Sequence, residues 1–125
     1  MKPSATLLCL LASATFTTGV MADDAPFKKS GDILVNQAGM TLYTFDKDAV
    51  GSGKSNCNDA CAGLWPPVMA TATSSGSGDY SVISRDDGSK QWAVKGKPVY
   101  LFSKDKQMGD RTGDNVKDVW HVIKN

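Results

Sequence analysis

The chain contains the same short sequence pattern twice, and this repeat constrains its fold more than any other feature. Residues 39–48 and residues 96–105 both begin with glycine, continue with a tyrosine and a phenylalanine two residues apart, and end with aspartate. The copies are 57 residues apart (96 − 39 = 57), and a tryptophan follows each of them. A repeated segment indicates that one supersecondary unit is used twice, so we expect two equivalent halves related by a pseudo-twofold.

The first 22 residues have the composition of a secretory signal peptide. Lys2 supplies a basic start, residues 5–20 are apolar or small apart from serine and threonine, and a small-residue cleavage site ends at Ala22. We therefore expect residues 1–22 to be removed, a periplasmic or secreted location, and no transmembrane segment in the mature chain. The alternative is an uncleaved N-terminal anchor. Cys9 lies inside the apolar run, so we do not expect it to carry a lipid.

Composition limits the partners of the mature chain. Cleavage leaves 103 residues (125 − 22), which suffices for one small domain with one core. Lysine and arginine then number 13 (14 − 1) against 13 acidic residues, so the net charge is about zero. Such a balance argues against nucleic acid and against an anionic membrane surface as partner. Every acidic residue is aspartate, which favours turns over helix interiors.

The hydrophobic residues form runs of strand length that are separated by turn residues. Asp87 and Gly88 stand between two alternating runs, which is a strong signal for a β-hairpin. Residues 57–63 suit one short helical turn, and Pro66 and Pro67 end it, because proline lacks a backbone donor. We predict an all-β fold, a small antiparallel sandwich or partly open barrel built from two repeats. The strands are expected near residues 33–35, 41–45, 80–84, 91–94, 98–102 and 119–123.

Local composition also divides the mature chain. Residues 23–30 look like a flexible leader, and residues 31–125 are predicted to form a single domain. Residues 71–78 contain only threonine, alanine, serine and glycine, which is typical of a connecting segment. We therefore place the two repeats at about residues 31–70 and 80–125.

The repeated motif favours packing over chemistry. Its tyrosine and phenylalanine lie on one face of a strand, and we expect this aromatic face to be the core face, where burial contributes roughly 25 cal/mol per Å². Asp48 and Asp105 follow the strands and can accept backbone N–H bonds from their own loops. The alternative is that both carboxylates converge near the tyrosine hydroxyls as an acid–base pair. The motif residues are Tyr43, Phe45, Asp48, Tyr100, Phe102 and Asp105.

Two copies of Tyr-x-Phe-x-x-Asp behind a signal peptide resemble a family of secreted repeats and predicted lipoproteins, which is named for a Tyr-x-(Phe/Trp/Tyr)-x-x-Asp motif. The cysteine pair before Trp65-Pro66-Pro67, and residues 86–91 leading into residues 96–100, resemble the same family. The resemblance covers about residues 31–123. It implies an extracytoplasmic location and a duplicated architecture, and it implies no reaction. Many relatives look lipid-anchored, whereas this chain lacks an anchor cysteine and is expected to be soluble.

Cys57 and Cys61 are the only cysteines that remain after cleavage. Two thiols this close usually pair in an oxidising compartment, so we predict a structural disulfide in a distorted turn. A redox-active couple and a metal thiolate pair are the alternatives.

Few residues point to a metal site or to an aromatic binding surface. His121 is the only histidine, and Met40, Met69 and Met108 would form a soft copper site only if they converged. We therefore predict no metal and no cofactor, with copper as the alternative. The three tryptophans form a ligand platform only on condition that they are exposed. They are Trp65, Trp92 and Trp120.

No catalytic motif accompanies these features. With one histidine beside the C-terminus, a Ser-His-Asp triad is implausible, and no glycine-rich phosphate loop follows a strand. The sequence therefore favours an exported envelope module, not an enzyme, that binds a small ligand or an envelope protein. The alternative is a periplasmic redox or copper-handling protein that uses Cys57 and Cys61, together with methionines or His121.

Overall fold

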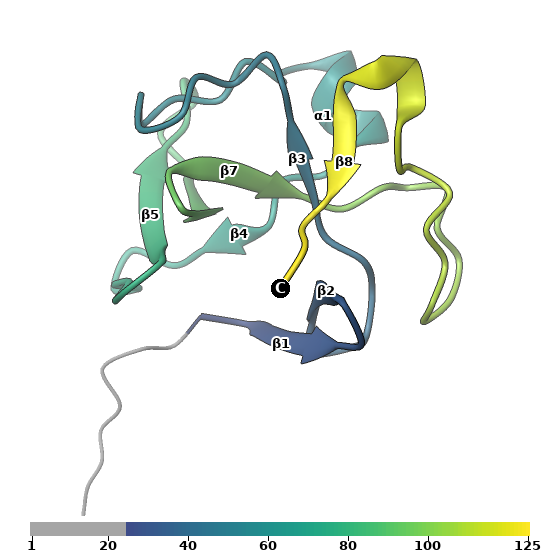
Figure 1. Ribbon diagram of the computed structural model, residues 1–125. Helices are drawn as coiled ribbons and strands as arrows, with labels where there is room; N and C mark the ends of the chain where they lie inside the picture. The colour runs from purple at the N-terminus through teal and green to yellow at the C-terminus, as the bar shows by residue number, and fades with distance from the viewer. Residues whose placement is uncertain (1–24) are drawn as a thin grey trace, which may run out of the picture.

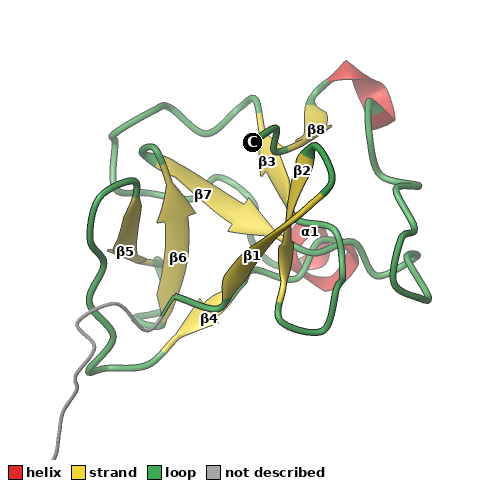
Figure 2. Ribbon diagram, turned by 60° about the horizontal axis from the view of Figure 1, so that its bottom comes forward, coloured by secondary structure: helices red, strands yellow, loops and turns green. Residues whose placement is uncertain are grey.

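The computed structural model of the protein describes residues 25–125, so the predicted signal peptide lies outside the described residues. The fold is all-β, as predicted, with two antiparallel sheets in a sandwich-like arrangement and no closed barrel (Figures 1 and 2). One short helix lies where the sequence predicts a helical turn. The elements are β1 (Phe27–Ser30), β2 (Ile33–Asn36), β3 (Tyr43–Phe45), α1 (Ala60–Leu64), β4 (Met69–Ala70), β5 (Tyr80–Ser84), β6 (Lys90–Val94), β7 (Lys97–Tyr100), the 3₁₀ turn η1 (Val116–Asp118) and β8 (Trp120–Val122).

The larger sheet has six strands and the smaller has two. The larger has the order β4-β6-β7-β3-β8, with β5 also paired to β6, and the smaller is the β1–β2 hairpin. In Figure 1 this hairpin lies below β3, β7 and β8, at the end opposite α1. Figure 2 shows β5, β6 and β7 side by side. Single β-bridges from Val35 to Thr41 and from Ile33 to Lys124 connect the hairpin to the segment before β3 and to the C-terminal segment.

The two repeats meet where β3 pairs with β7. Tyr43 lies opposite Tyr100 in this antiparallel pair, so the equivalent tyrosines are register partners. On the other side of each strand the pairing is again equivalent, because Tyr43 also lies opposite Val122 and Tyr100 forms a bridge with Pro67. The two halves are therefore related by the pseudo-twofold that the repeat predicts.

The two faces of the β3–β7 region, including Leu42 just before β3, contact different clusters of the core, although Thr44 on β3 is only half-buried. Tyr43, Phe45 and Tyr100 belong to one cluster, and Leu42 and Val99 belong to the other. The expectation that the aromatic face is the core face is therefore incomplete. Leu42 and Val99 are also buried, in the cluster that contains Phe27 and Leu34 of the β1–β2 hairpin.

The flexible leader predicted for residues 23–30 is wrong for Phe27–Ser30, which form strand β1, and residues 23 and 24 lie outside the described residues. Phe27–Ser30 pair with β2 over four register positions. Phe27 is buried and packs edge-on against Tyr80 and Trp92, with ring centroids 5.0 and 5.8 Å away. This one aromatic anchor, together with the β2 ladder, holds a segment whose other residues are exposed.

Candidate functional site

A pocket of about 390 Å³ lies where the two repeats meet, at the end of the molecule that carries α1. Its walls come from α1, from η1 and from the chain around the ends of β3 and β8. Figure 1 places α1 and the yellow turn η1 at this same end. Each of these short helical elements lies between a motif aspartate and the tryptophan of its repeat. The lining is mostly apolar and consists of Phe45, Lys47, Ala60, Cys61, Leu64, Trp65, Val116, Lys117, Val119 and Trp120.

Four aromatic rings form a continuous stack beside this pocket. Phe45 stacks on Trp120 with ring centroids 4.1 Å apart, and Trp65 stacks on Phe102 at 4.0 Å. The two tryptophans stack on each other at 3.8 Å, with their planes within 3°. Each phenylalanine thus packs on the tryptophan of the other repeat, and neither repeat builds the stack alone.

The pocket meets the two tryptophans only at their ring edges. Each tryptophan has two stacked neighbours, and two rings this close cannot lie on the same face of one indole. The stack therefore covers both faces of Trp65 and both faces of Trp120. Both residues are only 3% exposed. Within residues 25–125 neither indole N–H donates a hydrogen bond. Since a buried tryptophan N–H usually has an acceptor, two unused donors belong to side chains that line this pocket.

The charged groups of the pocket are both cationic. Lys47 and Lys117 are exposed, and no acidic residue lines the pocket with them. Neither ammonium group has an ion-pair or hydrogen-bond partner in the described part of the chain. Lys117 also has a left-handed backbone, with φ of 52°.

The predicted disulfide fixes the α1 wall of the pocket. Cys57 and Cys61 are bonded, with Cα atoms 5.2 Å apart. Cys57 is fully buried, whereas Cys61 is half-buried and lines the pocket.

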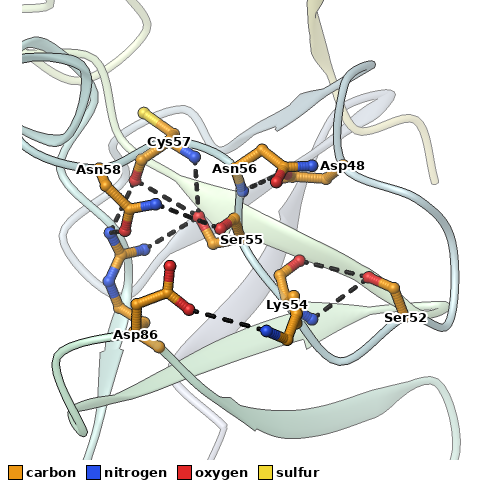
Figure 3. A network of polar contacts seen from close by, with 9 residues as sticks. Asp48, Ser52, Lys54, Ser55, Asn56, Cys57, Asn58 and Asp86 are labelled. Atoms are coloured by element: carbon orange, nitrogen blue, oxygen red, sulfur yellow. Dashed lines mark hydrogen bonds and ion pairs between the residues drawn. The ribbon is translucent and has the colours of Figure 1, made fainter.

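Arg85 anchors the segment that precedes α1. Its guanidinium, which is buried, donates hydrogen bonds to the carbonyl of Cys57 at 2.7 Å and to Oδ1 of Asn58 at 3.1 Å. It also donates to Ser55 Oγ at 3.2 Å and to Gln91 Oε1 at 2.7 Å. Figure 3 shows Ser55, Cys57 and Asn58 gathered around these donors. The arginine therefore ties the β5–β6 turn to the disulfide loop.

The motif tyrosines and aspartates form two hydrogen bonds that cross between the repeats. Tyr43 donates to Oδ2 of Asp105 at 2.6 Å, and Tyr100 donates to Oδ2 of Asp48 at 2.5 Å. Asp48 is 2% exposed and Asp105 is 7% exposed, and none of these four residues lines the pocket. The structure therefore places each aspartate with the tyrosine of the other repeat, in the protein interior.

Each carboxylate also accepts a bond from its own loop. Oδ1 of Asp48 accepts from the backbone N–H of Asn56 at 2.6 Å, which Figure 3 shows, and Oδ1 of Asp105 accepts from that of Thr112 at 3.0 Å. Burial raises the pKa of Asp48 above its usual value, and the hydrogen bonds from Tyr100 and Asn56 only partly oppose this effect. This environment suits a structural carboxyl group that is held away from solvent.

Burial also raises the pKa values of the two motif tyrosines. The hydrogen bond from Tyr43 to Asp105, and that from Tyr100 to Asp48, act in the same direction, because each stabilises the protonated phenol. Both phenols therefore stay neutral hydrogen-bond donors at physiological pH.

The remaining candidate residues lie on several segments of the chain. His121 lies 2.8 Å from Asp46 through Nε2 and 3.1 Å from Asn115 through Nδ1, so both ring nitrogens have protein partners. Met69 lies on β4 and is exposed, while the side chain of Met108 lies over Gly39. Within residues 25–125 no group of three or more histidine, cysteine or acidic side chains is placed to hold a metal ion.

The exposure on which a tryptophan platform depends is not found. Trp65, Trp92 and Trp120 are all 3% exposed or less. Trp92 packs in the second core cluster, beneath the β1–β2 hairpin. Only the edges of Trp65 and Trp120 are available, at the pocket.

A larger depression of about 520 Å³ lies on the other side of α1, and it is more polar. Its lining includes Asp59, Asp86 and Asp87, and Asp86 lies 4.0 Å from the ammonium group of Lys54. Three exposed acidic residues on loops are ordinary solvated turn residues. We therefore take the apolar pocket as the candidate site, although it is the smaller of the two.

Sequence reasoning missed the residues that turn the stack into a pocket, namely Lys47, Leu64, Val116 and Lys117. Lys47 follows strand β3, and Leu64, Val116 and Lys117 lie between the motif aspartate and the tryptophan of their own repeat. The motif specifies none of these four positions. The available signal was positional, because equivalent segments of two repeats face each other across a pseudo-twofold.

Comparison with known proteins identifies the repeats themselves. Residues 28–69 and 81–124 each match the sequence model of one family, Lipoprotein_15, which is described as a secreted repeat of unknown function. No curated protein and no solved structure matches the chain significantly. Among residues 25–125, none of the helices has the length and apolar character needed to cross a membrane.

Proposed function

The chain belongs to this family of secreted repeats of unknown function, and we propose that it is an exported binding module that holds a small apolar ligand in the pocket between α1 and η1. The proposal includes a periplasmic or secreted location. Cleavage near Ala22 would release the chain into the periplasm or the medium, and N-terminal sequencing of the exported protein should then begin at Asp23.

One observation carries the proposal, namely that the pocket is built from both repeats around their stacked tryptophans. Its volume of about 390 Å³ falls in the range of small-molecule sites, and its lining combines apolar side chains with few polar groups. Rigid aromatic walls and a disulfide-bonded helix favour a preformed site, because little side-chain entropy is lost when a ligand binds.

The residues that line the pocket favour ligand binding over catalysis. It supplies apolar surface, two lysines and a bonded cysteine, whereas acid–base or nucleophilic chemistry needs a reactive group next to a base. The motif aspartates and tyrosines are buried elsewhere and bond to each other.

A neutral fluorescent probe tests the site. N-phenyl-1-naphthylamine becomes fluorescent in apolar surroundings, so the wild-type protein should increase its emission. Ala60→Phe should abolish the increase, because Ala60 lines the pocket and a phenyl group would fill it. Ala62→Phe is the matched control, since Ala62 lies on the same helix and lines the polar depression instead. Absence of binding, or equal binding by both variants, would refute the proposed site.

A redox role for Cys57 and Cys61 is the second candidate, and one contact favours it. Cys61 lines the pocket and is only half-buried, so a thiol in the pocket has access to the bridge. A copper role has less support, because Met69 and Met108 lie on separate segments and His121 already has two partners. The reduction potential of the bridge separates the redox role from binding.

A further inference from the structure

We propose that the ligand of this pocket is a small organic anion, in which an apolar body carries one carboxylate or similar oxyanion. The inference rests on the proposed function and adds the chemical class of the ligand. The apolar body occupies the space between α1 and η1, and the anionic group lies toward Lys47 and Lys117.

The first argument is the charge of the pocket. Two lysines line it without any acidic residue, and neither ammonium group has a partner in the described part of the chain. In the described part of the chain the exposed Lys28, Lys29, Lys95 and Lys104 also lack an ammonium partner, but none of them lines this pocket. An exposed ion pair contributes little in water, but a neighbouring apolar wall strengthens the attraction by lowering the local dielectric constant.

The second argument is the unused donors. Trp65 and Trp120 line the pocket, are 3% exposed, and have indole N–H groups without an acceptor in residues 25–125. A ligand oxygen would supply that acceptor. The edges of aromatic rings also carry the positive part of the ring quadrupole, so the surface that the stack presents to the pocket favours a negatively charged group. Within residues 25–125 the indole N–H of Trp92 has no acceptor either, but Trp92 does not line the pocket.

The third argument is the backbone of Lys117. It has φ of 52° inside η1, between Asn115 at 67° and Asp118 at 61°. Lysine is rarely found in this left-handed region, where glycine is the usual residue. Strained positions of this kind concentrate at functional sites. Lys95 has the same φ in the β6–β7 turn, so what distinguishes Lys117 is that this backbone carries a side chain that lines the pocket.

Two probes of equal shape test the inference. We would measure the binding of 2-naphthoate and of the neutral 2-naphthamide to the mature protein by heteronuclear NMR titration. We expect naphthoate to bind about tenfold more tightly than the amide at low salt. The difference should shrink as the salt concentration rises, because exposed lysines are screened. Octanoate is a further arm, and its affinity relative to naphthoate tells whether the natural ligand has an aliphatic or an aromatic body.

Lysine variants connect this preference to the pocket. Lys47→Gln and Lys117→Gln should each weaken naphthoate binding by about threefold to tenfold and leave the amide unchanged. Lys104→Gln is the matched control, because Lys104 is the repeat counterpart of Lys47 (104 − 47 = 57) and does not line the pocket. Lys117→Gly should raise the stability of the free protein while it weakens naphthoate binding.

The possible outcomes separate the two proposals. Equal affinities for acid and amide, with no effect of the lysine variants, would overturn the anion preference and leave the binding function standing. Loss of naphthoate binding in Lys104→Gln as well would also overturn it, since the effect would then be one of net charge. If neither naphthyl probe binds and N-phenyl-1-naphthylamine also fails to bind, the binding function itself is wrong.

Discussion

Tyr43 of the first repeat donates its hydroxyl hydrogen bond to Asp105 of the second, 62 residues further along the chain. The reciprocal bond runs from Tyr100 to Asp48. Each copy of the motif thus supplies one donor and one acceptor to the other copy, and the second oxygen of each carboxylate accepts from its own loop. The motif therefore joins the two repeats, and the equal spacing of its residues in both copies places these groups in the interior of the fold.

Removal of either tyrosine hydroxyl should destabilise the protein. Tyr43→Phe leaves a buried oxygen of Asp105 without its donor, and Tyr100→Phe does the same to Asp48, so each should lower the free energy of unfolding by about 1–3 kcal/mol. Urea unfolding at neutral pH measures the change. Tyr80→Phe is the control, because its hydroxyl has no partner within residues 25–125. If all three variants lose the same stability, the bonds between the repeats contribute nothing specific.

A methyl group at Gly113 should disturb the aromatic stack. A Cβ atom there would lie 2.7 Å from Cη2 of Trp65 and 3.0 Å from Cδ2 of Phe102, and neither stacked ring has room to move. We expect Gly113→Ala to lower the free energy of unfolding by about 1–3 kcal/mol, as overpacked cores do. Near-ultraviolet circular dichroism should report the disturbed rings. Gly63→Ala is the control, because a Cβ atom at that helical position contacts nothing within 4 Å. Equal stability of the two variants would contradict the packing at Trp65.

The fold class, the pseudo-twofold and the disulfide were predictable from the sequence. A tyrosine and a phenylalanine two residues apart must share one face of a strand, and two nearby cysteines in an exported chain are expected to pair. The partner of each aspartate was not predictable. Loop bonds to Asp48 and Asp105 follow from local sequence, but the bonds from the tyrosines depend on the antiparallel pairing of β3 with β7.

The missed features have a common physical cause. Strand β1 has only one buried side chain, Phe27, so its sequence has no alternating pattern and resembles a polar leader. The pocket depends on how α1 and η1 approach each other, and Lys47 and Lys117 are 70 residues apart in the chain (117 − 47 = 70). Tertiary contacts of this kind leave no periodic signal in one sequence.

The buried carboxyl group of Asp48 should make stability depend on pH in a defined direction. Its pKa is raised by burial, so the folded chain binds the proton more tightly than the unfolded chain. The resulting stabilisation is fully present below the unfolded pKa, about 3.9, and is lost as the pH rises through the folded pKa. Relative to Asp48→Asn, which does not titrate, wild type should therefore lose stability as the pH rises from about 3.5 to 7. Urea unfolding across this range measures the difference, and an increase with pH would contradict the desolvated carboxyl group.

The bond between Cys57 and Cys61 should stabilise the fold and hold the pocket open. Closure of a five-residue loop contributes about 2 kcal/mol to the free energy of unfolding, so the double variant Cys57→Ser/Cys61→Ser should lose about that amount. Its affinity for N-phenyl-1-naphthylamine should also fall, because α1 is then no longer fixed by the bridge. Reduced wild-type protein is the control and should behave like the double variant, since both lack the same covalent bond.

The reduction potential of this bridge decides between its two roles. A structural bridge should have a potential below about −300 mV, whereas thiol oxidoreductases lie between about −270 and −120 mV. We expect the lower value, because Cys57 is fully buried. Arg85 also holds its loop by hydrogen bonds to the Cys57 carbonyl and to the Asn58 side chain. Equilibration with glutathione or dithiothreitol buffers, followed by alkylation of free thiols, measures the potential. A value within the oxidoreductase range would favour the redox role and make Cys61 at the pocket wall the cysteine that an incoming thiol attacks.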